Sequence, residues 1–430
     1  MKRRWIVLGL VLLGVVLLSC LASAQETVTL RFSWWGGDSR HRATVQAIER
    51  YMELNPHVVI KPEYSGWDGY HDKLTTQYAA RSAPDISQLE VTLVMEYAAR
   101  GLIEEVGSAF HGEFKDIDES LWSMFIDESG QVWAIPMGTN TVSVHYNKTM
   151  FDDFGVAYTF AGWTWDDVYE IAKKMTKDIN GDGQIDIYGI NTLFTPSNDS
   201  VPVILYQWGG SFFRNNYTEP NLDSGALAKY LEMAKKFQDE KLAPGPDDIV
   251  VYTGSQNGFN QRKVAMNPAM ISTLETTQAL MDDEIGNVPW PKAPETGLTG
   301  TFLKPSQAVV INKNSKHKDE AMKFLEWFLT SPEAALITRF ERGVPSSRTQ
   351  RDALANADIG DFQRKVIAWT NECAEYVDST PELSPPGFLE MQFTVIDLMQ
   401  EVQYEVSTVD AVIKKMQSKC VDILNRYMQQ

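Results

Sequence analysis

The chain has 430 residues, more than one hydrophobic core usually supports, so we expect two domains. Its 57 acidic and 39 basic residues give a net charge of -18, which argues against nucleic acid or an anionic membrane surface as a partner. The apolar content of 43% is that of an ordinary globular protein, and the 12 Trp, 16 Tyr and 19 Phe make the chain rich in aromatic residues.

The first residues are organised like an export signal. Residues 2–4 are basic, residues 5–18 are apolar but too short to span a bilayer comfortably, and residues 22–24 form a small-residue cleavage site. Residues 1–24 are therefore predicted to be a signal peptide. The sequence around Cys20 also resembles a bacterial lipobox, in which Cys20 would carry lipid. A soluble periplasmic protein and a lipid-anchored cell-surface protein both remain open.

The first predicted strand ends in two tryptophans. In residues 29–33, Leu30 and Phe32 alternate with polar residues, a pattern that predicts a strand with one buried face. Trp34, Trp35 and two glycines follow before a helical pattern begins, which places the tryptophans at the carboxyl edge of a sheet, where open α/β sheets bind ligands. Indole rings suit the apolar face of a sugar. The alternative is that both tryptophans are core aromatics.

Helices and strands alternate along the first hundred residues. We expect helices at residues 40–54, 70–81 and 93–100, and strands at residues 58–64 and 83–89. This order predicts an α/β fold with a parallel sheet. Two extended segments at residues 132–136 and 142–147 then suggest a crossing between lobes. Further predictions are a helix capped by Thr164, helices at residues 222–241 and 318–329, a strand at residues 308–312, and a helical tail from Phe388.

One acidic loop has the spacing of the first half of a calcium-binding loop. Its oxygen-bearing side chains are Asp178, Asn180, Asp182, Gln184 and Asp186. The closing glutamate is absent, because Gly189 occupies its position. A structural calcium ion and an Asx-rich turn are both open, and no other cofactor is expected.

Two cysteines lie outside the predicted signal peptide. Cys373 and Cys420 could form a disulfide in an exported chain, or could be two buried thiols.

The chain resembles the extracellular solute-binding proteins of family 1, the maltose-binding-protein-like receptors of ABC sugar importers. The resemblance spans essentially the whole mature chain and rests on eight short stretches in the same order. They are residues 34–37, 70–74, 83–86, 133–136, 146–148, 262–266, 316–321 and 343–346. Three stretches, residues 34–41, 303–306 and 341–345, are similar to receptors for pectin-derived oligosaccharides.

The resemblance implies a two-lobed periplasmic-binding-protein-like fold of type II that closes on its ligand. The hinge segments would lie near residues 137–142, 298–306 and 343–348. The N-terminal lobe would comprise residues 25–138 and 300–345, and the C-terminal lobe residues 139–299 and 346–430. A monomer would then capture an oligosaccharide and deliver it to the permease subunits of an ABC transporter.

Ligand-binding residues follow from the family pattern and from the ends of the strands. They are Trp34, Trp35, Arg40, Trp67, Tyr70, Glu90, Asn140, Trp208, Phe212, Asn260, Trp290 and Lys304. Arg40 and Lys304 are the cations expected to meet a uronate carboxylate, whereas the alternative for both is a solvated surface charge.

Two other classes of protein compete with this interpretation. An exported glycoside hydrolase would need two facing carboxylates, and Glu63, Asp85, Glu90 and Asp127 are available. The order of elements does not give the eight strand–helix repeats of a barrel, and no nucleophile elbow or phosphate loop is present. A receptor of the same fold for a neutral oligosaccharide or a non-sugar solute is the other alternative. We predict a binding protein without enzymatic activity.

Overall fold

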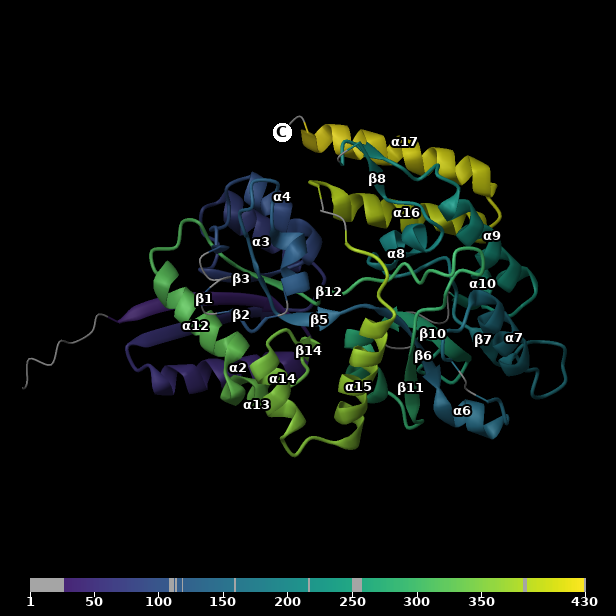
Figure 1. The fold of residues 1–430 in the computed structure, drawn as a ribbon, viewed down its shortest axis with the longest axis horizontal. Coiled ribbons are helices and arrows are strands. Elements are labelled where there is room, and N and C mark those ends of the chain that lie inside the picture. Colours follow the sequence, from purple (N-terminus) through teal and green to yellow (C-terminus); the bar gives the residue numbers. More distant parts are fainter. Residues whose placement is uncertain are drawn as a thin grey trace, which may run out of the picture.

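The computed structural model describes residues 27–428 except 108–111, 113, 118, 158–159, 216, 250–256 and 382–384, so the predicted signal peptide lies outside the described residues. The chain forms two α/β lobes that lie side by side (Figure 1). Within the described part of the chain, no helix is both long and apolar enough to cross a membrane.

The first lobe contains a five-stranded sheet in the order β2-β1-β3-β13-β4. Its strands are β1 Val28–Trp35, β2 Val58–Ser65, β3 Ile86–Leu89, β4 Ile135–Pro136 and β13 Ala308–Ile311. β1 is parallel to β2 and β3, whereas β13 is antiparallel to β3 and β4. The carboxyl ends of β1, β2 and β3 therefore meet at one edge of the sheet.

Both faces of β1 are buried, so the expectation of a single buried face was wrong. Leu30, Phe32 and Trp34 pack with α2 Asp38–Leu54 and α12 Lys318–Thr330. Trp35 points to the other face and packs with α3 Tyr70–Ala79 and α4 Val94–Ala99. Because helices cover both faces, the alternation of polar and apolar residues in the strand does not mark a solvent-facing side.

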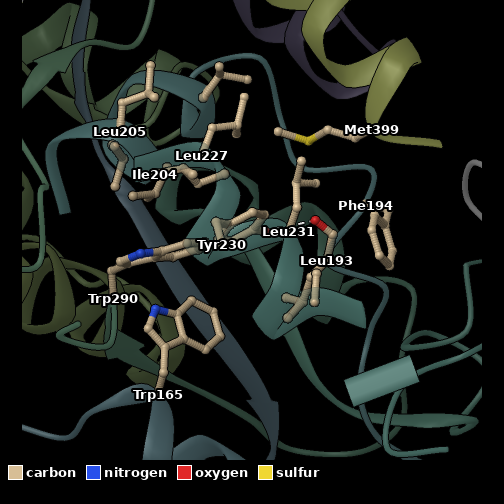
Figure 2. Close-up of a cluster of buried hydrophobic side chains, with 14 of the residues drawn as sticks. Trp165, Leu193, Phe194, Ile204, Leu205, Leu227, Tyr230, Leu231, Trp290 and Met399 are labelled. Carbon is tan, nitrogen blue, oxygen red and sulfur yellow. Dashed lines mark hydrogen bonds between the residues drawn. The ribbon is translucent and has the colours of Figure 1, made fainter. Parts of the chain in front are cut away.

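The second lobe is built on a four-stranded sheet in the order β11-β6-β10-β7. Its strands are β6 Val142–Asn147, β7 Tyr188–Ile190, β10 Val264–Met270 and β11 Ile285–Pro289. Helices α7 Trp165–Met175, α8 Ser200–Gln207, α9 Ala226–Asp239, α16 Phe388–Gln403 and α17 Val409–Met428 supply its largest core. Figure 2 shows Trp165, Tyr230 and Trp290 in this core. The predicted N-cap is confirmed, because Thr164 and Asp167 form a capping box at the start of α7.

A small sheet connects the lobes at the three predicted crossings. Its order is β12-β5-β14, and its strands are β5 Gly138–Asn140, β12 Lys304–Pro305 and β14 Val344–Pro345. The backbones are packed closely here, because a Cβ atom on Gly138 would lie 2.4 Å from the carbonyl oxygen of Arg342. Gly343 has a φ of 82°, a left-handed conformation that favours glycine.

The other elements surround these sheets. The helices are α6 Lys148–Asp153, α10 Pro246–Ile249, α11 Leu274–Gln278, α13 Pro332–Thr338, α14 Arg348–Ala355 and α15 Asp361–Glu375. There are 3₁₀ turns at Val91–Leu93, Glu119–Phe125 and Ile271–Thr273. Strands β8 Phe213–Arg214 and β9 Glu219–Pro220 pair with each other.

Helix α14 packs on α12 and α13 of the first lobe, although the expected boundary at residue 345 assigns it to the second lobe. The side-chain amide of Gln350 on α14 donates 3.0 Å to the carbonyl of Phe328.

Cys373 and Cys420 do not form a disulfide. Both are free and buried, and they lie in different hydrophobic clusters. The alternative of two buried thiols is therefore correct.

Candidate functional site

Four aromatic rings gather at the carboxyl edge of the first sheet. We call Trp35, Trp67, Tyr70 and His71 the aromatic cluster. The ring centroid of Trp35 lies 5.2 Å from those of Trp67 and Tyr70 and 5.1 Å from that of His71. Trp67 follows β2 and is 44% exposed, whereas Trp35 is 7% exposed. The exposed ring of Trp67 can therefore stack on a ligand while Trp35 supports it from behind.

Trp34, the other member of the tryptophan pair, points away from this cluster. It is fully buried, lies between the rings of Phe32 and Tyr64, and donates its indole N–H to Nδ1 of His41 at 3.2 Å. The strand alternation thus sends Trp34 into the core and Trp35 to the edge.

Burial keeps the imidazole of His71 neutral. Desolvation lowers the pKa of His71 to about 4, against an opposing effect of Asp72. Among the described residues, neither ring nitrogen of His71 has a hydrogen-bond partner. A neutral imidazole next to Trp35 offers one donor and one acceptor, the kind of group that binds sugar hydroxyls.

Tyr70 and Gln88 link the aromatic cluster to two arginines. The hydroxyl of Tyr70 donates to the carbonyl of Gln88 at 2.8 Å. The side-chain amide of Gln88 donates to the carbonyl of Trp35 at 3.5 Å, and Nη1 of Arg40 donates to the same carbonyl at 3.2 Å. Oε1 of Gln88 accepts from Nε of Arg342 at 3.0 Å. Arg40 and Arg342 therefore both lie at the carboxyl ends of β1 and β3.

A second polar group, which we call the charged triad, joins the lobes and consists of Glu90, Asp199 and Lys304. Nζ of Lys304 on β12 lies 2.5 Å from Oδ1 of Asp199, at the start of α8. It also lies 3.9 Å from Oε1 of Glu90, which follows β3. Each of the three residues is largely buried; for example, Lys304 is 2% exposed. A pocket of about 10 Å³ beside the triad is lined from both lobes, so the lobes are in contact here.

Burial and the charges of the neighbouring residues shift the pKa values of Glu90 and Lys304. Burial raises the pKa of Glu90 to about 7, although Lys304 opposes this change. Burial alone would lower the pKa of Lys304, but the carboxylates of Asp199 and Glu90 raise it. Lys304 is therefore charged and already compensated by two acids.

Asn140 supports the hinge. Its side-chain Oδ1 accepts from the backbone N–H groups of Thr141 and Ser272, each at 3.1 Å. This oxygen fixes β5 against the turn that follows β10.

Asn260 is half-buried in the turn before β10, where its backbone N–H donates to Oδ1 of Asn257 at 2.9 Å.

Three predicted ligand-binding aromatics lie elsewhere in the second lobe. Phe212 is fully buried against Phe388, and Trp290 is 1% exposed and packs on Trp165 (Figure 2). Trp208 follows α8 at the end opposite Asp199, about 12 Å along the helix axis. There it lines a surface pocket of about 310 Å³ with Trp165, Tyr169 and Glu295. The structure thus does not bring these three residues to the aromatic cluster or the triad.

The acidic loop closes on its own backbone. The carboxylate of Asp178 accepts from the N–H groups of Gly181 and Gly183, and that of Asp186 accepts from the N–H of Ile179. The side chains of Asn180 and Asp182 each accept from the N–H two residues ahead, which is the geometry of Asx turns. Over the described residues, no cluster of three or more His, Cys, Asp or Glu side chains could hold a metal ion.

Sequence reasoning missed four polar residues of this region: His71, Gln88, Asp199 and Arg342. A signal existed for Arg342, because it lies within the stretch 341–345 that resembles pectin-oligosaccharide receptors. Asp199 precedes the apolar run of α8 and could have been recognised as a residue near a helix start. His71 lies within the stretch 70–74 that carries the family resemblance, whereas nothing in the local pattern distinguishes Gln88.

Comparisons with known proteins agree with this architecture. A family model of bacterial extracellular solute-binding proteins matches residues 37–335. A binding protein of Brucella abortus (strain 2308) is 24% identical over 434 residues, which is 99% of each chain. A maltotriose-binding protein of Pyrococcus abyssi is 23% identical over 66% of this chain and 59% of its own.

One solved structure shows the shared fold. A periplasmic oligogalacturonide-binding protein from Yersinia enterocolitica, in complex with saturated digalacturonic acid, matches with a TM-score of 0.78 and 23% identity over 93% of this chain and 100% of its own. The predicted two-lobed fold is confirmed.

Proposed function

Because this chain belongs to the bacterial extracellular solute-binding proteins, we propose that it is the substrate-binding receptor of an ABC carbohydrate importer for a uronic-acid-containing, pectin-derived oligosaccharide. One observation carries the proposal: at the carboxyl edge of the first sheet, the aromatic cluster is hydrogen-bonded to Arg40 and, through Gln88, to Arg342. A flat ring for the sugar face and a cation for its carboxylate are the two groups that such a ligand requires.

The known relatives support a sugar ligand. The relative from Pyrococcus abyssi binds maltotriose, and the structure from Yersinia enterocolitica holds saturated digalacturonic acid. A neutral oligosaccharide is the second candidate for this chain, since the charged triad offers carboxylate oxygens that accept hydrogen bonds from sugar hydroxyls.

The carboxylates considered for a glycoside hydrolase are engaged in structural contacts. Glu63 pairs with Arg31 at 2.5 Å, and Asp85 accepts from the backbone N–H of Arg31 at 2.9 Å. Asp127 accepts from the indole N–H of Trp133 at 2.8 Å, and Glu90 belongs to the charged triad. These contacts support a binding role without catalysis.

Capture would use the three-stranded hinge sheet. A ligand that contacts both lobes stabilises the closed state over the open state, and a membrane permease would read the closed form. As further parts of this proposal, the mature protein is a monomer, exported either to the periplasm or to a lipid anchor at Cys20, and a structural calcium ion at residues 178–186 remains an alternative to a metal-free loop.

A thermal-shift panel tests the proposal. The mature protein would be heated with oligogalacturonides and with neutral malto-, xylo- and manno-oligosaccharides, because a ligand of the folded state raises the melting temperature. We expect the largest rise with oligogalacturonides. A rise with neutral sugars alone would favour the neutral receptor, and cleavage products accumulating over hours would favour an enzyme.

A further inference from the structure

We propose that Arg342 is the residue that binds the ligand carboxylate, in a site completed by Arg40 and Gln88. The inference rests on the proposed uronide receptor and deepens it. It transfers the role expected for Arg40 or Lys304 to a different residue.

Arg342 carries a buried positive charge that no carboxylate of the described residues pairs with directly, although the charge of the neighbouring Glu341 partly offsets it. It is 6% exposed, and its guanidinium lies 5.5 Å from the centroid of Phe328. Nε is bonded to Gln88, but neither Nη1 nor Nη2 has a hydrogen-bond partner among the described residues. Burial, together with the nearby charge of Arg40, lowers the pKa of Arg342 well below its usual value. A buried guanidinium with two free nitrogens is costly unless an anion binds it.

Arg40 adds to this positive charge instead of relieving it. Its Nε donates to the backbone carbonyl of Glu341 at 2.7 Å, and its Nη1 donates to the carbonyl of Trp35. The carboxylate of Glu341 accepts from the hydroxyl of Ser39 at 3.1 Å. Within the described part of the chain, no carboxylate forms an ion pair with Arg40 or Arg342. Arg40 is therefore held by carbonyls and acts as a second, fixed cation.

Lys304 cannot serve the same purpose. Its ammonium group is already paired with Asp199 at 2.5 Å, with Glu90 at 3.9 Å, so a uronate brought to it would meet the carboxylate of Asp199. Like charges at such distances repel, so the acidic group of a ligand is favoured at Arg342 and its hydroxyls at the triad.

The chain places Arg342 on a constrained turn at the hinge. Arg339 has φ 46° and ψ -126°, a conformation that is strained for any residue other than glycine. The hydroxyl of Ser306 on the neighbouring crossing donates to the carbonyl of Arg342 at 2.5 Å. The residue directly precedes Gly343 and β14 of the hinge sheet. Strain of this kind is expected where a side chain must be presented in one fixed position.

The free nitrogens match the geometry of a carboxylate. Nη1 and Nη2 of one guanidinium lie in a plane and can bind both oxygens of a carboxylate in parallel. Gln88 orients this fork through Nε and also contacts the carbonyl of Trp35. Gln88 thereby connects the guanidinium of Arg342 to Trp35 of the aromatic cluster.

The test compares digalacturonate with its dimethyl ester, which keeps the sugar but removes both charges. Affinities would be measured by isothermal titration for the wild type, Arg342→Gln and Arg342→Lys. Arg50→Gln is the matched control, because Arg50 lies on the same helix as Arg40 but pairs with Glu53 and Glu333 at the surface. We expect Arg342→Gln to weaken binding of the acid about 10- to 100-fold and to leave binding of the ester unchanged.

The outcomes separate this inference from the proposed function. A folded Arg342→Gln that still prefers the acid over the ester would overturn the inference while keeping the receptor. Binding of neither compound, nor of neutral oligosaccharides, would overturn both. If Arg342→Gln does not fold, Arg342→Lys takes its place in the test. This variant keeps the positive charge but lacks the planar guanidinium, so it must bind the acid with a smaller preference over the ester than the wild type does. The wild-type melting temperature gives an independent measure, since it must rise more with the acid than with the ester.

Discussion

Lys304 and Asp199 form an ion pair of 2.5 Å that connects the hinge to the second lobe. Lys304 belongs to the hinge strand β12, and Asp199 precedes α8. Glu90, from the first lobe, lies 3.9 Å from the same ammonium group. One buried cation therefore holds the two lobes and the hinge together.

Removing this cation should strongly destabilise the protein. Lys304→Met leaves the carboxylate of Asp199 without its partner beside the buried Glu90, so we expect the free energy of unfolding to fall by about 3–5 kcal/mol. Urea denaturation measures this change. Lys323→Met is the control, because Lys323 is 62% exposed in its pair with Glu320 and should cost less than about 1 kcal/mol. Equal stability of the two variants would contradict the role of the triad.

Stability should depend on pH through Glu90. Its pKa is raised from 4.5 to about 7, so between these values the folded state holds a proton that the unfolded state has released. The stabilising contribution is present below pH 4.5 and is lost as the pH rises toward 7. We therefore expect the wild type to lose stability relative to Glu90→Gln across this window. The control is Glu53→Gln, a surface site on α2.

Two buried histidines have the opposite effect on the pH dependence of stability. The wild type must therefore be compared with Glu90→Gln to isolate the contribution of Glu90. Burial lowers the pKa of His71 to about 4 and that of His145 to about 3. Both therefore favour folding more as the pH rises toward 6.5. The pH profile of the wild type alone is a sum of these effects. A difference profile that is flat between pH 4.5 and 7 would show that Glu90 ionises normally.

Trp67 should contribute to ligand affinity and little to stability. Because its ring is 44% exposed, Trp67→Ala removes a stacking surface without opening the core. We expect the affinity for oligogalacturonide to fall about two- to tenfold in isothermal titration. Trp34→Phe is the matched control: it alters a fully buried ring and should lower the melting temperature while leaving affinity unchanged. The reverse pattern would place the ligand elsewhere.

The acidic loop should hold its shape without calcium. Its carboxylates accept hydrogen bonds from loop amides, for example from Gly181 and Gly183 to Asp178. We expect the melting temperature to be the same in EDTA and in millimolar calcium chloride. A calcium-dependent rise that disappears in Asp178→Asn would instead support a structural ion at this loop.

Much of the fold follows from local sequence patterns. The strand and helix of residues 28–54 and the cap at Thr164 are encoded by neighbouring residues, so periodicity and capping chemistry predict them. The two long C-terminal helices follow from the same apolar spacing.

The candidate site was less predictable because it depends on contacts between distant segments. Strand position alone does not decide whether Trp34 or Trp35 faces the edge, since that depends on which helices cover each face. Trp290 is aromatic and follows a strand, yet it packs on Trp165 in the core. Arg342 meets Gln88 across 254 residues, and no local pattern reports such a contact.

Isothermal titration of the mature protein with digalacturonate, and with maltotriose as the neutral comparison, tests the central claim most directly. We expect one saturable site for digalacturonate and weaker binding of maltotriose, because only the acid can occupy the free nitrogens of Arg342. Tighter binding of maltotriose, or binding of neither sugar, would contradict the account.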